Sequence, residues 1–156
     1  MTERDVSVLE QQLRAHPLVR GLEEADIAKV LNYARLVEFE AHDSIFEEGG
    51  SADTFYLVRT GVVGLLVSQA AGQQRRIESI HEGSALGWSW LFPPYVWQFS
   101  ATAETLVRGI AIDAVGLREE FDEDPGFGYR LIARIAEVMA KRLHAARRHL
   151  INLMGT

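Results

Sequence analysis

The stretch DSIFEEGGSADTFYLVRTGVVGLLV, residues 43–67, decides the fold class. Short apolar runs lie at 44–47, 54–59 and 62–68, and the segments between them, EEGGSAD and RTG, are rich in turn-forming residues. Glycine adopts backbone conformations that other residues avoid, and aspartate and serine hydrogen-bond their own backbone in turns. Short strands joined by such turns are typical of an all-β sandwich or barrel.

The same pattern continues on both sides of this stretch. Residues 35–40 alternate polar and apolar side chains, as a half-buried strand does, and further short runs lie at 75–81, 98–103 and 106–112. The gaps QAAGQQ and HEGSALG again supply turns. We therefore expect a β-barrel over residues 34–113.

Helical patterns flank the β region. Residues 1–33 contain two of them, one at 4–15 that stops at His16-Pro17 and one at 21–33, because the residue before a proline is driven out of the helical conformation. Residues 114–156 contain a short helix at 115–121, a break at 122–126 and a long helix over 128–153.

The long helix has two apolar stripes. The first is a heptad seam with alternating spacings of four and three, made of Ile132, Ala136, Met139, Leu143, Ala146, Leu150 and Leu153. The second consists of Leu131, Ile135 and Val138. We expect the second stripe to cover the barrel and the seam to pair with the same helix of a second chain, forming a homodimer. The alternative is a helix that lies wholly against its own barrel.

Composition excludes several classes of protein. The 156 residues suggest a single domain with helical appendages, and the absence of cysteine excludes disulfides, cysteine-ligated zinc and thiol catalysis. The N-terminus has no signal-peptide core, and the longest apolar runs fall short of a membrane helix. A net charge of −6 argues against a nucleic-acid binder. We expect a cytoplasmic protein without membrane contact.

Residues 86–97, LGWSWLFPPYVW, contain all three tryptophans of the chain around a double proline. Such an aromatic segment is too apolar to be left in water and must hold a fixed shape. Pro93-Pro94 is expected to fix a turn after a short helix, with a cis bond as the rarer alternative.

The order of helices, barrel and long helix resembles the cyclic-nucleotide-binding domain family, which includes catabolite-activator and FNR-type regulators and kinase regulatory subunits. HPLVRGLEEADIAKVL, residues 16–31, resembles the entry helices of that family, and residues 43–67 resemble its most recognisable strand pair. Within that pair the agreement covers Ile45, Gly49, Ala52-Asp53, Tyr56-Leu57-Val58, Gly61 and Val63. The resemblance covers residues 16–153 and implies a jelly-roll barrel, or double-stranded β-helix.

The resemblance implies that residues 83–103 correspond to the phosphate-binding cassette, which in the family presents a helix N-terminus, a glutamate and an arginine to the cyclic nucleotide. Gly83 and Gly87 keep the frame of this cassette segment. The glutamate position is Trp88 and the arginine position is Trp97, followed by Gln98. Both polar anchors are therefore absent, and we expect no binding of cyclic AMP or cyclic GMP in the usual way.

Residues 139–153 resemble the long helix of the catabolite activators, and the two positions that contact the base there are Ala146 and Arg147 here. We name as pocket candidates Gly87, Trp88, Ser89, Trp97, Gln98, Ser100 and Arg147. The tryptophans either line a pocket for another, nucleotide-like ligand or fill the vacated space as core. No cofactor is expected beyond such a small ligand.

No motif supports catalysis. The five histidines lack the His-x-His spacing of a metal-binding cupin, and the chain has neither a nucleophile elbow nor a P-loop. We expect a non-enzymatic, metal-free regulatory domain without a DNA-binding module, unless the chain is truncated. The alternatives are an accessory subunit of a larger, for example redox, enzyme complex with a plugged pocket, and a cyclic-nucleotide binder with atypical contacts.

Overall fold

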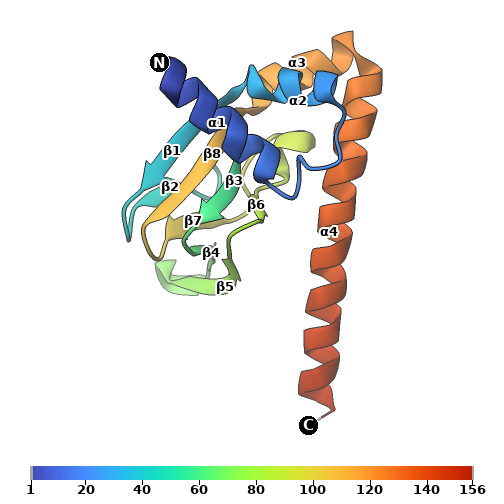
Figure 1. Cartoon of the computed structure of the whole chain (residues 1–156). Helices are drawn as coiled ribbons and strands as arrows, with labels where there is room; N and C mark the ends of the chain where they lie inside the picture. The colour runs from blue at the N-terminus through green and yellow to red at the C-terminus, as the bar shows by residue number, and fades with distance from the viewer. Residues whose placement is uncertain (1, 156) are drawn as a thin grey trace.

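The computed structural model describes residues 2–155 and confirms a mainly β fold with flanking helices (Figure 1). Two helices come first, α1 (Glu3–Ala15) and α2 (Glu24–Leu31). The strands follow as β1 (Ala34–Phe39), β2 (Ser44–Phe46), β3 (Thr54–Thr60), β4 (Val63–Ser68), β5 (Gln74–Ile80), β6 (Ala85–Leu86), β7 (Ser100–Ala103) and β8 (Val107–Asp113). Two short 3-10 turns, η1 (Ala70–Gly72) and η2 (Ser89–Leu91), interrupt them, and α3 (Ala114–Glu123) and α4 (Pro125–Met154) close the chain.

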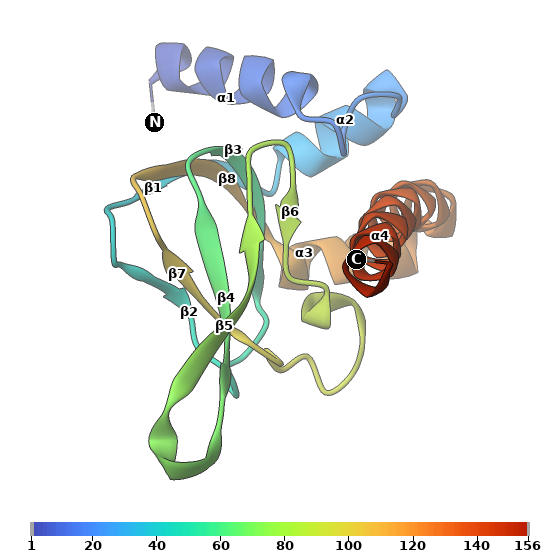
Figure 2. The ribbon, with the colours of Figure 1, turned by 90° about the horizontal axis from the view of Figure 1, so that it is seen from below.

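The strands form two four-stranded sheets in which every neighbouring pair is antiparallel. One sheet has the order β1-β8-β3-β6 and the other the order β2-β7-β4-β5. Alternate side chains of β3 and β8, among them Phe55, Leu57, Ile110 and Ile112, are almost fully buried in the core. The β4–β5 hairpin extends beyond the rest of the barrel (Figure 2).

The N-terminal helices differ slightly from the sequence prediction. Helix α1 ends at Ala15, as the His16-Pro17 pair predicts. Helix α2 begins at Glu24 rather than at Gly21, because Gly21 has a φ of +96° and so breaks any helix through it.

The expected break between the two C-terminal helices shrinks to a single residue, Asp124. Its side chain accepts a hydrogen bond of 3.2 Å from the backbone N–H of Phe127 and so caps α4. Pro125 stands at the first helical position, where its missing N–H costs nothing, and α4 therefore begins three residues before the predicted start at 128.

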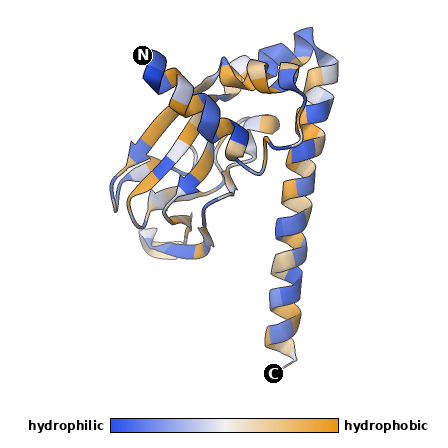
Figure 3. Cartoon of the chain, in the orientation of Figure 1, coloured by the Kyte–Doolittle hydropathy of each residue, from blue (hydrophilic) through white to orange (hydrophobic). Residues whose placement is uncertain are grey.

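Helix α4 is buried only over its first half. Leu131 and Ile135 are at most 2% exposed and belong to the main core, and Val138 packs against that core, as the second stripe predicts. Beyond Arg142 every described residue of α4 is exposed, and the helix projects past the barrel (Figure 1). Apolar bands continue along this projecting part (Figure 3).

Candidate ligand pocket

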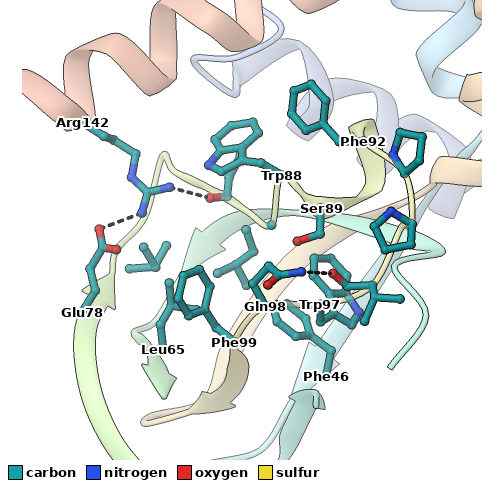
Figure 4. A pocket seen from close by; sticks show the side chains of 17 residues that line it. Phe46, Leu65, Glu78, Trp88, Ser89, Phe92, Trp97, Gln98, Phe99 and Arg142 are labelled. Atoms are coloured by element: carbon teal, nitrogen blue, oxygen red, sulfur yellow. Dashed lines mark hydrogen bonds and ion pairs between the residues drawn. The ribbon is translucent and has the colours of Figure 1, made fainter. Parts of the chain in front are cut away.

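A cavity of about 380 Å³ lies between the barrel, the cassette segment and α4 (Figure 4). Its walls are mostly aromatic and aliphatic: Phe46, Leu65, Ile80, Ala85, Leu86, Gly87, Trp88, Phe92, Pro93, Pro94, Val96, Trp97 and Phe99. The polar groups are Glu78, Ser89, Gln98 and Arg142. A mostly apolar concavity with a few polar groups is the usual form of a small-molecule site.

Trp97 occupies the space directly in front of Gly87. Its backbone is held by the turn after β2, because its N–H donates to the carbonyl of Gly50 and its carbonyl accepts from the N–H of Gly49, both at 2.9 Å. The indole stacks on Phe46 with ring centroids 3.8 Å apart and an interplanar angle of 10°. Gly87 has a φ of +86°, and any side chain there would overlap the indole.

The expected short helix of the cassette segment is only one 3-10 turn, Ser89–Leu91. Trp88 precedes it and makes no side-chain capping bond. The helix-dipole contribution to anion binding grows with aligned peptide groups, and a single turn supplies few of them.

The three tryptophans have different roles. Trp90 is fully buried, with its ring centroid 4.9 Å from that of Phe55, and is core. Trp97 is 5% exposed and Trp88 is half-buried, and both line the cavity. The sequence left open whether the tryptophans line a pocket or fill it as core, and neither interpretation holds for all three. Trp90 is core, whereas Trp88 and Trp97 line the cavity that remains.

Helix α3 fixes the turn that carries these rings. The Arg118 guanidinium donates a hydrogen bond of 2.8 Å to the carbonyl of Trp90 and lies 4.0 Å from the centre of the Tyr95 ring. The Pro93-Pro94 peptide bond, which lies between Trp90 and Tyr95, is cis. A cis bond was expected here only as the rarer alternative.

Five of the seven sequence candidates line the cavity: Gly87, Trp88, Ser89, Trp97 and Gln98. Ser100 does not, because its hydroxyl lies on the other side of the strand and accepts a hydrogen bond of 2.9 Å from the N–H of Glu48. Arg147 does not either, because α4 has left the barrel by that point and the side chain is exposed.

Sequence reasoning missed Arg142 and Glu78. The Arg142 guanidinium reaches from α4 to the rim of the cavity, where it binds the Glu78 carboxylate at 2.7 Å and the carbonyl of Ala85 at 3.4 Å (Figure 4). The sequence could have indicated Arg142, because it lies one helical turn before the candidate base-contacting position Ala146 and on the same face of α4. These contacts connect α4 to β5 and β6.

The architecture at this site is a pair of antiparallel sheets with a pocket beside the Gly87 turn and the long helix α4 at its rim. The model of the cyclic nucleotide-binding domain matches residues 36–124, more than half of the chain. The chain belongs to this family, as the sequence resemblance predicts.

Relatives of known identity are regulatory proteins. A CRP-like cAMP-activated global transcriptional regulator of Mycobacterium tuberculosis is 25% identical over 139 residues, which are 89% of this chain and 60% of the relative. The chain thus spans less than two thirds of the relative that it matches.

Solved structures share the fold. A putative cyclic nucleotide-binding protein from Geobacter metallireducens matches with a TM-score of 0.76 and 26% identity over 86% of this chain and 98% of its own. The Thermus thermophilus catabolite activator protein matches with a TM-score of 0.65 and 24% identity, over 88% of this chain and 63% of its own. A mutant regulatory subunit of a cAMP-independent protein kinase A from Trypanosoma brucei, bound to cAMP, matches with a TM-score of 0.63 and 17% identity. This match covers 81% of this chain and 50% of that subunit chain.

Neither a cluster of metal-ligating side chains nor a membrane-spanning helix is found within residues 2–155. Within that range no three histidine or acidic side chains gather so as to hold a metal ion. None of the helices described there is long and apolar enough to span a membrane.

Proposed function

We propose that this chain is a non-catalytic regulatory domain that senses a small molecule other than a cyclic nucleotide bound in the family's usual way. The position of the Trp97 indole carries the proposal, because it replaces a phosphate-binding cation and lies against Gly87. A cyclic phosphate placed there would lose its water and gain no charged partner, which costs more than ordinary hydrogen bonds return.

The contacts of Arg142 suggest how occupancy would be transmitted. This side chain joins α4 to β5 and β6 at the rim of the cavity. A ligand that favours one arrangement of these contacts shifts the population of α4 positions, and a partner protein can recognise the change. The same fold occurs in the regulatory subunit of a cAMP-independent protein kinase A, and the mutant of it that was solved has cAMP bound. This supports a nucleotide specificity that depends on individual side chains rather than on the fold. We place this action in the cytoplasm.

Titration calorimetry tests the nucleotide specificity. Wild-type protein is expected to show no saturable heat with cyclic AMP or cyclic GMP at micromolar concentrations. The variant Trp88→Glu/Trp97→Arg restores the two anchors and is expected to bind cyclic AMP at least tenfold more tightly, since a charge-assisted hydrogen bond contributes about 1.5–3 kcal/mol. A dissociation constant in the low micromolar range for the wild type would overturn the proposal.

We further propose that the domain acts as a homodimer through the projecting half of α4. Ile132, Leu143 and Leu150 of the heptad seam are 42%, 51% and 57% exposed. A stripe of this kind in water is unfavourable, and the matching stripe of a second chain covers it with knobs-into-holes packing. Met139 of the seam is half-buried against the barrel, so the paired surface lies mainly beyond it.

Leu143→Glu is expected to convert the dimer to a monomer, because two glutamates would face each other within an apolar interface. Sedimentation velocity measures the change in mass. The control is His144→Glu, which adds the same charge at the neighbouring exposed position outside the seam and is expected to leave the dimer intact. A wild-type monomer at 100 micromolar, on the order of concentrations at which such helix pairs associate, would refute the dimer.

The accessory-subunit alternative has one supporting observation. Trp97 does fill the anion cradle, as a plug would. The cavity that remains beside it favours the sensor over the plugged subunit.

A further inference from the structure

The charges of the cavity cancel. Among residues 2–155, Glu78 and Arg142 are the only ionisable side chains that line it, and they bind each other at 2.7 Å. The remaining hydrogen-bonding capacity of Arg142 is directed in part to the carbonyl of Ala85. An anion entering the cavity would have to compete with Glu78 for the same guanidinium and would be repelled by that carboxylate.

The rest of the wall offers surface for stacking. Trp97 is held rigid by stacking on Phe46 and is only 5% exposed, so it contributes little free surface to the wall. Trp88 lies half-buried beside the opening. Phe92 and Phe99 are 62% and 40% exposed. Exposed rings at the mouth of a cavity are unfavourable in water and would be covered by an apolar molecule bound there.

Few polar groups remain to orient a ligand. The Ser89 hydroxyl points into the cavity (Figure 4), and no hydrogen-bond partner for it is seen within residues 2–155. The Gln98 amide already donates a bond of 3.2 Å to the carbonyl of Val96. A volume of about 380 Å³ lies at the lower end of the range for small-molecule sites, which begins at about 300 Å³.

We propose that this cavity binds an uncharged, largely apolar aromatic molecule, and that the Glu78–Arg142 ion pair sets this charge preference. The inference rests on the proposed function, which makes the cavity the ligand site, and it adds the ligand class. A neutral ring gains from stacking and from the removal of apolar surface from water, and it leaves the ion pair in place. The ion pair thus works as a selectivity element against anions.

A matched pair of fluorescent probes tests the charge preference. N-phenyl-1-naphthylamine is neutral, and 8-anilino-1-naphthalenesulfonate has the same N-phenylnaphthylamine scaffold with one negative charge. Wild-type protein is expected to bind the neutral probe saturably and at least tenfold more tightly than the sulfonate. The opposite order of affinities would overturn the inference.

Filling the cavity locates the probe. Ser89→Phe places a ring in the void and is expected to weaken binding of the neutral probe at least tenfold. The matched control Ser7→Phe adds the same ring at an exposed position of α1 and is expected to have no effect. Unchanged affinity in Ser89→Phe would show that the probe binds elsewhere and would refute the site.

Releasing the guanidinium should narrow the preference for the neutral probe. In Glu78→Gln the Arg142 cation loses its partner, so affinity for the sulfonate is expected to rise about three- to fivefold, the scale of a half-exposed ion pair. Affinity for the neutral probe should stay within twofold. The control Glu38→Gln breaks the exposed Arg108–Glu38 pair between β1 and β8 and is expected to change neither affinity. A sulfonate affinity unchanged by Glu78→Gln would contradict the role of the ion pair.

Cyclic AMP titrated into the same samples separates the two proposals. Tight binding of cyclic AMP by the wild type counts against the proposed function as a whole. Absence of binding by both cyclic AMP and the neutral probe counts against the ligand class and favours the plugged-pocket subunit.

Discussion

Trp97→Ala is expected to lower the free energy of unfolding by about 3 kcal/mol, the lower end of the cost of removing a buried tryptophan. The indole is 5% exposed and makes close contact with Phe46 on one side and with Gly87 on the other. Its removal deletes both contacts. The cost stays near the lower end because the indole borders a cavity, so part of its surface makes no packing contact that could be lost.

Urea denaturation followed by circular dichroism measures this loss, because a change in tryptophan number would distort fluorescence. The matched control is Trp88→Ala, which removes the same side chain from a half-buried position and is expected to cost less than half as much. A loss below about 1 kcal/mol for Trp97→Ala would mean that the indole does not pack into the cradle.

Trp97→Ala also separates steric blocking from missing charge. If the indole excluded cyclic AMP only by its bulk, the alanine variant would bind the nucleotide. We expect no such binding, because the emptied cradle still lacks the cation that a buried phosphate needs. The arginine variant proposed above supplies that cation, and the two variants together attribute the specificity to charge.

The local part of the fold was predictable from sequence. Turn residues and alternation place seven of the eight strands to within two residues, because these signals depend on neighbouring residues only. The two-residue strand β6 was missed, since it lies in the HEGSALG stretch that was interpreted as a turn. The two stripes of α4 likewise predict which face is buried, since the helical period fixes the faces of the helix. Gly21 shows the limit, because a helical period continues through it and only its positive φ reveals the break.

The site was predictable only in part, because it depends on contacts between distant segments. The contact between Trp97 and Gly87 requires that the chain around Trp97 pair with the turn at Gly49 and Gly50, and no local pattern specifies that pairing. The Glu78–Arg142 pair joins residues 64 positions apart. The family resemblance supplied the frame of the pocket, and the structure supplied the charges on its rim.

Ser100 and Arg147 show why two candidates do not line the cavity of this chain. Phe99 lines the cavity, and successive side chains of a strand point to opposite faces, so Ser100 at the start of β7 faces away from it. The position of Arg147 follows from the direction of α4, which a helical pattern does not contain. Both differences concern orientation rather than location along the chain.

Acidification from pH 7 to pH 4 is expected to remove about 3 kcal/mol of stability through His16 alone, of which about 2 kcal/mol is lost by pH 5. Burial lowers the pKa of this imidazole from 6.5 to about 4, and hydrogen bonds to backbone carbonyls oppose the shift only in part. Between pH 7 and pH 4 the unfolded chain holds more protons at His16 than the folded chain does, so the free energy of unfolding falls as the pH falls.

The hydrogen bonds of His16 explain why the neutral ring is required. Its Nδ1 accepts from the backbone N–H of Leu18 at 3.2 Å, and its Nε2 lies 3.3 Å from the carbonyl of Ser84, to which it donates. Protonation of Nδ1 would place two donors against each other inside the core, next to the strand that leads into the pocket. The ring therefore connects the end of α1 to the turn before β6 only while it is neutral.

Urea denaturation of the wild type and of His16→Asn at pH 7 and pH 5 isolates this effect. The variant keeps an acceptor and a donor but does not titrate, so the stability difference between the two pH values is expected to shrink by about 2 kcal/mol relative to the wild type. His81→Asn is the control, because that ring is exposed in the folded chain and its replacement should leave the difference unchanged. Equal pH dependence in the wild type and His16→Asn would show that the buried imidazole does not govern acid stability, and that carboxylates do.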